Sequence, residues 1–374
     1  MVIPSVFHWS NRFYIDNSEL VELEKDGIQR VYHKLLDIDW NPANGAHPVS
    51  VVDIPHQWRD YYGQPGEWTN RYELVPSIYI TNNTFTHLDD AATDQLAHNL
   101  LRKLRMACPA RFHGVLIDCD WTATTKARFF RVTRMLNDSL NVPVIATIRL
   151  HQYAHPGKTG VPPADRGMLM PYNVGKLNAP GDVNSIFDQS LAEPYFSNTG
   201  PYPLPLDIAL PAFSWGVQFR KGHFIGILQE AEVSKALELA LLNGETHGTL
   251  QVVREDNERM PELHLGDEIR VERMTPELIE QAAHLAQNAV NSDTIAVAFF
   301  EVGTFAFQQL EPARVRSVLE GFGQVRSGGS AQSSALVQSD ETVTDTVAAD
   351  SAAWTVYDSV AASPFVPNVP AVEP

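Results

Sequence analysis

Short runs of apolar residues alternate with amphipathic segments along most of the chain. The runs are uninterrupted, as in strands that a parallel sheet buries on both faces. They predict eight strands, at 6–9, 30–39, 77–81, 114–120, 142–150, 168–173, 206–213 and 294–301. Strand and helix patterns that alternate in this way predict an α/β fold of the closed (β/α)8 type, a TIM barrel, with a doubly wound open sheet as the alternative.

The amphipathic segments predict helices between these strands. The clearest is 86–106, with acidic residues in its first turns and basic residues near its end, as the helix dipole favours. Its apolar face carries Ala92, Leu96, Leu100, Leu104 and Ala107. Shorter helices are predicted at 18–26, with Ser18 as the N-cap, and at 123–137.

Two stretches depart from this repeat. Residues 216–274 predict an α+β insertion between the seventh and eighth strands. Its hairpin, helix and two further strands are expected at 215–228, 233–242, 250–254 and 268–273. Residues 327–374 contain no Lys or Arg and are rich in Ser, Ala, Val, Thr and Pro, so they cannot bury much surface. The chain is therefore divided into a barrel at 1–326 and an acidic tail, which we expect to be disordered and a possible contact for a protein partner.

Composition narrows the classes of function. The 374 residues are 44% hydrophobic, which is enough for one large core. The net charge of −17, without a basic run, argues against a nucleic-acid partner. No apolar stretch has the length of a membrane span, and the first residues lack a signal-peptide pattern. We expect a cytoplasmic protein as the chain is written, or a secreted one if a leader has been removed. Two cysteines, Cys108 and Cys119, are too few for a disulfide framework.

The strongest candidate site lies at the end of the fourth strand. Side chains at the carboxyl ends of barrel strands converge on one mouth. Asp118 and Asp120 are two residues apart, so they share a face of the strand. Two carboxylates so close raise one pKa or attract a cation, and both are typical of functional sites. Arg149 on the fifth strand is a natural counter-charge. An Asp–Arg pair that only ties the barrel together is the structural alternative.

Other strand ends supply further candidates. Four tryptophans, at strand ends beside polar groups, suggest flat platforms on which sugar rings stack, although each alone is more often a core residue. The candidates besides the Asp118 cluster are Trp9, Asp39, Trp40, Trp121, His151, Gln152, Tyr172, Asn173, Trp215 and Glu301. His8 and His151 lack the spacing of a metal site, and no phosphate-binding, dinucleotide-binding or nucleophile-elbow motif is present. We therefore expect neither a metal nor a cofactor.

Three segments together resemble a known family. Residues 115–122, Val-Leu-Ile-Asp-Cys-Asp-Trp-Thr, resemble the fourth-strand motif D-x-x-D-x-D-x-E of the family 18 glycoside hydrolases, the chitinases and their relatives. Residues 170–173, Met-Pro-Tyr-Asn, resemble the sixth-strand M-x-Y-D, and 210–213 resemble the seventh-strand G-x-P-x-Y. The order is the same, and some of these chitinases also carry an α+β insertion. Residues 7–228 also resemble an uncharacterised bacterial family of barrel proteins, which implies no activity.

The chain departs from the chitinase motif at its acid. In that family, the last motif position is the glutamic acid that protonates the leaving oxygen, and here it is Thr122. A hydroxyl does not donate a proton to a glycosidic oxygen as a carboxyl of raised pKa does. The aspartate of M-x-Y-D is replaced by Asn173. Asp120 matches the residue that assists attack by the substrate's acetamido group. The resemblance therefore implies that the group that stabilises the attack is present, while the acid that protonates the leaving oxygen is absent.

Three hypotheses follow, and they leave enzymatic activity open. The first is a glycoside hydrolase-like enzyme in which Asp118 and Asp120 orient the substrate and Glu301 or Asp39 is the acid. The second is a pseudoenzyme, a barrel that binds a glycan or oligosaccharide without cleaving it, or a scaffold in a larger assembly. The third is an enzyme of another class that uses a divalent metal held by Asp118, Asp120 and His151.

Overall fold

The structure is a computed structural model of the chain. It describes residues 1–13, 15–52, 71–107, 112–178, 181, 183–197, 200–244 and 248–329. Most of the predicted tail, from residue 330 onward, lies outside the described residues. Its first three residues do not match the prediction, because they belong to the last helix, α12 (Pro312–Gly329).

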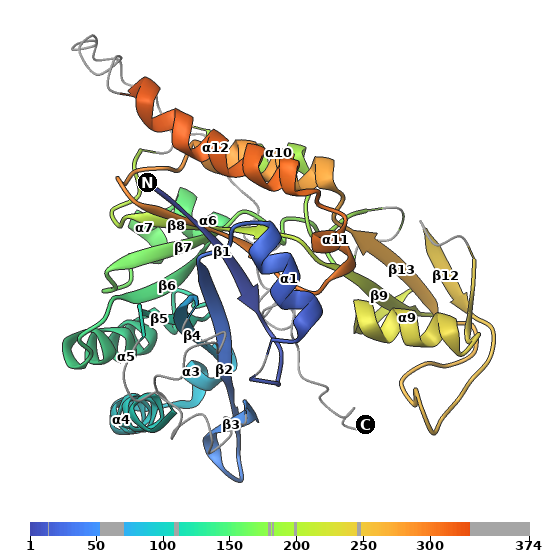
Figure 1. Cartoon of the computed structure of the whole chain (residues 1–374). Coiled ribbons are helices and arrows are strands. Elements are labelled where there is room, and N and C mark those ends of the chain that lie inside the picture. Colours follow the sequence, from blue (N-terminus) through green and yellow to red (C-terminus); the bar gives the residue numbers. More distant parts are fainter. Residues whose placement is uncertain are drawn as a thin grey trace, which may run out of the picture.

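Parallel strands close into the predicted barrel (Figure 1). The barrel strands are β1 (Val2–His8), β2 (Arg30–Asn41), β4 (Glu73–Ile80), β5 (Val115–Asp118), β6 (Val144–Arg149), β7 (Arg166–Met170), β8 (Leu206–Pro211) and β14 (Ile295–Phe300). They pair in the order β1-β14-β8-β7-β6-β5-β4-β2, and a parallel pairing of β1 with β2, for example Ser5 with Arg30, joins the two ends. This closure confirms the (β/α)8 barrel over the open sheet. A further strand, β3 (Gly45–Val51), pairs antiparallel with the end of β2.

Helices surround the barrel, and two of them differ from the predictions. They are α1 (Asn17–Lys25), α3 (Asn82–His87), α4 (Asp90–Ala107), α5 (Lys126–Ser139), α6 (Leu150–Ala154), α7 (Pro156–Thr159), α8 (Gln189–Phe196), α10 (Pro276–Gln287), α11 (Phe305–Gln308) and α12. The N-cap of α1 is Asp16 rather than Ser18, since the Asp16 carboxylate accepts from the backbone N–H groups of Ser18 and Glu19. The helix predicted at 86–106 is two helices, because the carboxylate of Asp89 accepts from the N–H of Ala92 at 2.8 Å and starts α4 separately. None of the described helices is both long and apolar enough to cross a bilayer.

The predicted α+β insertion forms a second sheet between β8 and β14, seen beside the barrel in Figure 1. It consists of β9 (Ser214–Arg220), β10 (His223–Gln229), α9 (Glu230–Glu238), β11 (Leu242–Asn243), β12 (Thr249–Val252) and β13 (Glu268–Arg273). The strands are antiparallel, in the order β10-β9-β13-β12-β11. Val233 of α9, Leu250 of β12 and Ile269 of β13 belong to a separate apolar core in this unit.

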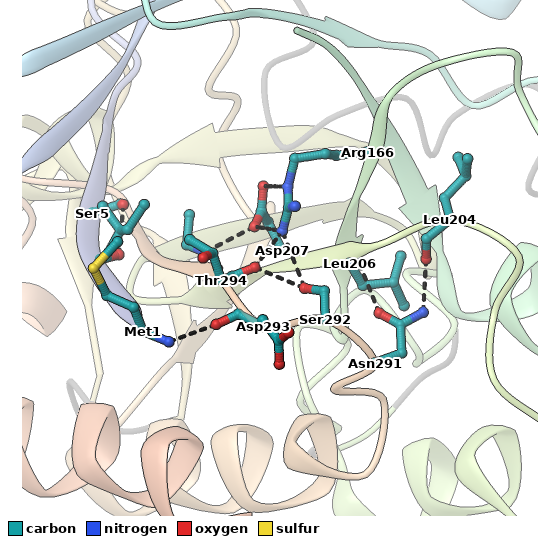
Figure 2. A network of polar contacts seen from close by, with 12 residues as sticks. Met1, Ser5, Arg166, Leu204, Leu206, Asp207, Asn291, Ser292, Asp293 and Thr294 are labelled. Carbon is teal, nitrogen blue, oxygen red and sulfur yellow. Dashed lines mark hydrogen bonds and ion pairs between the residues drawn. The ribbon is translucent and has the colours of Figure 1, made fainter. Parts of the chain in front are cut away.

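A buried ion pair ties three barrel strands together at their amino ends (Figure 2). Asp207 of β8 is 1% exposed and accepts two hydrogen bonds from the Arg166 guanidinium of β7, at 3.0 and 2.7 Å. The same carboxylate accepts from the N–H of Ala296 on β14, and Arg166 also donates to the carbonyl of Thr294. These contacts satisfy both charges within the barrel, which is the condition for burying them without a large cost.

Candidate functional site

A cavity of about 390 Å³ lies at the carboxyl ends of β5, β6 and β7. Its described lining is Asp120, Trp121, Thr122, Ala123, Arg149, Leu150, His151, Lys158, Thr159, Tyr172, Asn173, Val174 and Tyr195. Six of the candidate residues named from the sequence therefore meet there: Asp120, Trp121, Arg149, His151, Tyr172 and Asn173. The sequence did not point to Lys158 and Tyr195, because they come from α7 and α8 rather than from a strand end.

Arg149 lies between two aspartates, Asp120, which lines the cavity, and Asp118, which does not. Asp118 ends β5 and Arg149 ends β6, so neighbouring parallel strands bring them to the same edge of the sheet. The guanidinium Nε donates to one carboxylate oxygen of Asp120, and Nη2 donates to the other at 3.3 Å. Nη2 also lies 4.0 Å from Asp118 Oδ1, which accepts from the hydroxyl of Thr147 at 2.7 Å. Because Asp118 and Arg149 are 3% and 7% exposed, the two charges interact with little screening by water.

Burial shifts the protonation of these groups. Loss of hydration raises the pKa of Asp118 to about 6, while Arg149 opposes the shift and Asp120 adds to it. Although burial disfavours its charge, Asp120 and Asp118 raise the pKa of Arg149, so its charge is permanent. Burial lowers the pKa of His151 and raises that of Tyr172, so both are neutral near pH 7. At that pH, the Arg149 guanidinium is a permanent positive charge between Asp118 and Asp120.

Hydroxyl groups form a network at Thr122, on the cavity side of the turn that follows β5. Thr122 Oγ1 lies 2.9 Å from Thr124 Oγ1 and 3.2 Å from Thr125 Oγ1. The Thr122 N–H donates to Thr125 Oγ1, which fixes the backbone at this turn. Among the described residues that line the cavity, only Asp120 has a carboxylate, and Arg149 holds it in a two-point ion pair.

Tyr172 and Asn173 form the wall that follows β7. Asn173 adopts a left-handed backbone conformation, with φ of 59°, which asparagine tolerates better than most residues. Its N–H donates to the carbonyl of Ile186 at 2.6 Å. The Tyr172 side chain is buried, and its hydroxyl has no hydrogen-bond partner within the described part of the chain. A polar group of a bound molecule would satisfy that hydroxyl, which otherwise costs free energy.

The tryptophans serve mainly as packing residues. Trp9, Trp121 and Trp215 are 6%, 1% and 2% exposed. Trp121 stacks on Phe129 with ring centroids 4.9 Å apart, yet it also contributes to the cavity wall. Trp40 stacks on His87 at 3.8 Å, outside the described lining. The expectation of four open platforms for sugar rings therefore reduces to one wall at Trp121, with the half-buried Tyr195 as a further aromatic surface.

Gln152 holds two residues of the cavity wall, Arg149 and Trp121, by hydrogen bonds to their backbone. It is fully buried, its side-chain carbonyl accepts from the N–H of Arg149 at 2.8 Å, and its amide donates to the carbonyl of Trp121 at 3.2 Å. It therefore links the ends of β5 and β6, and it is not among the lining residues described above.

Asp39 and Glu301, the two carboxyls considered as acids, lie outside the described lining of the cavity. Asp39 accepts from the hydroxyl of Thr81 at 2.6 Å and from the amide of Asn83 at 3.2 Å, so it ties β2 to α3. Glu301 Oε2 accepts from the backbone N–H of Trp9 at 3.1 Å. Burial raises the pKa of Glu301 to about 8, which keeps this carboxyl largely protonated near pH 7.

Asp37, rather than Asp39, is the carboxylate of β2 whose charge acts on the pKa of Asp118. Asp37 is 2% exposed, pairs with Lys34 Nζ at 2.5 Å, and adds to the rise in the pKa of Asp118. Both residues stand at the same strand end in the sequence. The register shift between Asp37 and Ile38 leaves the extra residue, Val49, in β3, so Asp37 and Asp39 share a face of β2 and differ instead in burial, with Asp37 buried and Asp39 half-buried.

The residues proposed for a metal do not form a ligand set. Within the described ranges, no three His, Cys, Asp or Glu side chains are grouped so that they could hold a metal ion. Asp118 and Asp120 instead share the guanidinium of Arg149.

The fold and site define a (β/α)8-barrel protein with a cavity at the carboxyl ends of three of its strands. No protein-family model and no curated protein sequence matches the chain. Among solved structures, it is similar to a chitinase from Bacteroides thetaiotaomicron, at 11% identity over 86% of this chain and 97% of that one, with a TM-score of 0.49. It is also similar to the spore cortex-lytic enzyme SleL of Bacillus cereus, at 12% identity over 86% and 74%, with a TM-score of 0.45. A GH113 β-1,4-mannanase matches at 8% identity over 86% and 97%, with a TM-score of 0.43.

Proposed function

We propose that the chain binds a glycan in the cavity over β5, β6 and β7. The observation that carries this proposal is the Asp120–Arg149 pair in the cavity, beside the Tyr172 hydroxyl and the Trp121 wall. Fixed polar groups next to aromatic surface suit a ligand with many hydroxyls and apolar ring faces. A volume of about 390 Å³ lies within the range of small-molecule sites. Residues from two of the three segments that resemble the chitinases, 115–122 and 170–173, also line this cavity, which favours an N-acetylated sugar.

Binding without cleavage fits this cavity better than hydrolysis does. Glycoside hydrolysis ordinarily uses two catalytic groups, and one of them is a carboxylic acid that protonates the leaving oxygen. In the described lining, Asp120 is ion-paired with Arg149, and Thr122 stands at the acid position. The described lining therefore holds groups that orient a sugar, and its one carboxyl is held in the ion pair with Arg149.

Hydrolysis with a relocated acid is the second candidate function. The observation in its favour is Glu301, whose pKa is raised to about 8 and which follows β14 at the same end of the barrel as the cavity. Such a carboxyl retains its proton at neutral pH, as a general acid must. This mechanism requires a sugar long enough to extend from the cavity to Glu301.

Binding and cleavage can be separated with chitin-type and peptidoglycan-type oligosaccharides. We expect calorimetry to show binding and mass spectrometry to show no shorter products. Asp120→Asn should weaken binding at least about tenfold, since it removes the charge that Arg149 holds in place. Asp138→Asn is the matched control, because Asp138 is exposed on α5. Product formation that Glu301→Gln abolishes would establish the second candidate instead, and no binding of either sugar class would refute both.

A further inference from the structure

A buried carboxylate, Glu272 on β13, links the inserted sheet to the segment that supports one wall of the cavity. Its side chain is among the buried charged groups, at 2% exposure of the residue. Oε2 accepts three hydrogen bonds: from the Ser185 N–H at 2.8 Å, the Ser185 hydroxyl at 2.5 Å and the Trp215 indole N–H at 2.8 Å. Oε1 accepts from Arg270 Nε at 2.8 Å. One carboxylate thus joins β9 and β13 of the inserted sheet to a segment that follows β7.

That segment folds back onto the cavity wall. The Asn173 N–H donates to the Ile186 carbonyl at 2.6 Å, and the Gly175 N–H donates to the Ser185 carbonyl at 3.2 Å. The two halves of this fold-back approach so closely at Gly175 that a Cβ there would lie 2.6 Å from the Cα of Ser185. Ser185 and Ile186 are buried, so the position of Ser185 determines where Asn173 and Val174 stand in the cavity.

Two neighbours of Glu272 add contacts to the same segment. Arg270, paired with Glu272 at 2.7 Å, donates to the carbonyl of Leu177 at 3.0 Å. The Asn184 amide donates to the carbonyl of Arg273 at 3.0 Å. The sheet therefore holds the segment at several points, with the Glu272 carboxylate at the centre.

We propose that Glu272 is a positioning residue that fixes the Tyr172–Val174 wall for ligand binding. The inference rests on the proposed function, because it assigns the inserted sheet a part in the same glycan site. Glu272 does not line the cavity itself and acts through Ser185 and the Asn173–Ile186 hydrogen bond. A glutamine cannot replace it. Oε2 of Glu272 accepts from three donors, and Oε1 accepts from the Arg270 guanidinium. The NH2 group of a glutamine would therefore face a donor in either orientation of its amide.

The test compares Glu272→Gln with Glu277→Gln, a matched control on α10 whose side chain is 61% exposed in a surface pair with Arg314. Hydrogen–deuterium exchange of the free protein should be at least about tenfold faster in Glu272→Gln at the amides of 173–175 and 185–187, because charged hydrogen bonds of this kind are lost. Amides of β5 and β6 report any global loss of stability and should change much less. Ser185→Ala, which keeps the backbone donor, should give a smaller change of the same kind if Glu272→Gln does not fold.

Affinity for a chitin-type oligosaccharide gives the second measurement. A purely structural role would lower the melting temperature and leave the dissociation constant of the folded protein unchanged, whereas we expect that constant to rise about five- to tenfold. Unchanged exchange at 173–175, or faster exchange without a change in affinity, would overturn the inference. If the wild-type chain binds no oligosaccharide, the proposed function fails. The exchange data then still decide whether Glu272 fixes the wall.

Discussion

Removal of the cation that the two aspartates share is the most direct test of the site's electrostatics. In Arg149→Met, a side chain of similar length leaves Asp118 buried without its counter-charge, while Asp120, whose side chain is 19% exposed, remains in partial contact with water. Breaking a buried ion pair by removing one partner costs about 3–5 kcal/mol. Since Asp120 is partly solvated, we expect the lower end, about 3 kcal/mol at pH 7.5.

The loss of stability should depend on pH in a defined direction. The pKa of Asp118 is raised to about 6 in the folded protein. The stability that the protonated Asp118 contributes is therefore fully present below the pKa of the carboxyl in the unfolded chain, and it is lost as pH rises through about 6. Without Arg149, which lowers this pKa, the folded carboxyl keeps its proton to higher pH, and the penalty grows over that interval. One pKa unit corresponds to about 1.4 kcal/mol. The loss of stability should therefore be larger at pH 7.5 than at pH 5, by up to about 1.4 kcal/mol for each unit by which the pKa rises.

Urea unfolding at pH 5 and pH 7.5 measures both quantities. Arg131→Met is the control, because Arg131 makes a two-point ion pair with Asp94 on the surface, where it is 42% exposed. Such a surface pair contributes about 0–1 kcal/mol. An Arg149→Met variant that loses the same free energy at both pH values, or no more than the control, would refute the assigned charge interaction.

Three further predictions test other parts of the molecule. Asp207→Asn should lower the free energy of unfolding by about 3 kcal/mol in urea titrations, because it leaves the Arg166 charge without its partner at the amino end of the barrel, and glycan affinity should not change. Tyr172→Phe should weaken glycan binding by calorimetry while stability stays within about 1 kcal/mol, since the lost hydroxyl has no partner among the described residues. Burial lowers the pKa of His8 to about 3, so stability should rise with pH from about 3 to 6.5; His8→Phe should flatten that slope by up to about 1.4 kcal/mol per pH unit in thermal melts.

Local patterns were sufficient to predict the barrel, whereas the errors arise from a competing local signal in one helix and from tertiary contacts elsewhere. The strand of the insertion at 268–273 has the predicted bounds, since its turns and alternation are local features. The long helix expected at 86–106 is divided by Asp89, whose capping signal competes with a continuous apolar face. The buried indole N–H of Trp215 donates to Glu272, which is 57 residues away in sequence. No local pattern around Trp215 could therefore predict its partner.

The candidate site was predicted in part for a similar reason. Asp120 and Arg149 follow strands, so the barrel itself brings them together. Lys158 and Tyr195 reach the cavity from helices beyond the strands, and their approach depends on loop paths that periodicity does not encode. Asp37 rather than Asp39 acts on Asp118 although both lie on one face of β2, because Asp37 is buried deeper in the strand, and alternation alone does not predict that difference.

The distribution of buried charge separates stability from binding in this barrel. At the amino ends of the strands, the Arg166–Asp207 pair is satisfied entirely by protein groups, including backbone groups of β14. At the carboxyl ends, Arg149 is divided between Asp118, which is buried, and Asp120, which lines the cavity. A ligand that hydrogen-bonds to Asp120 would therefore alter the field at Asp118 through the shared guanidinium. Glycan binding should thus be coupled to the protonation of Asp118, and affinity should change between pH 5 and pH 7.5 in the wild-type chain but not in Asp118→Asn.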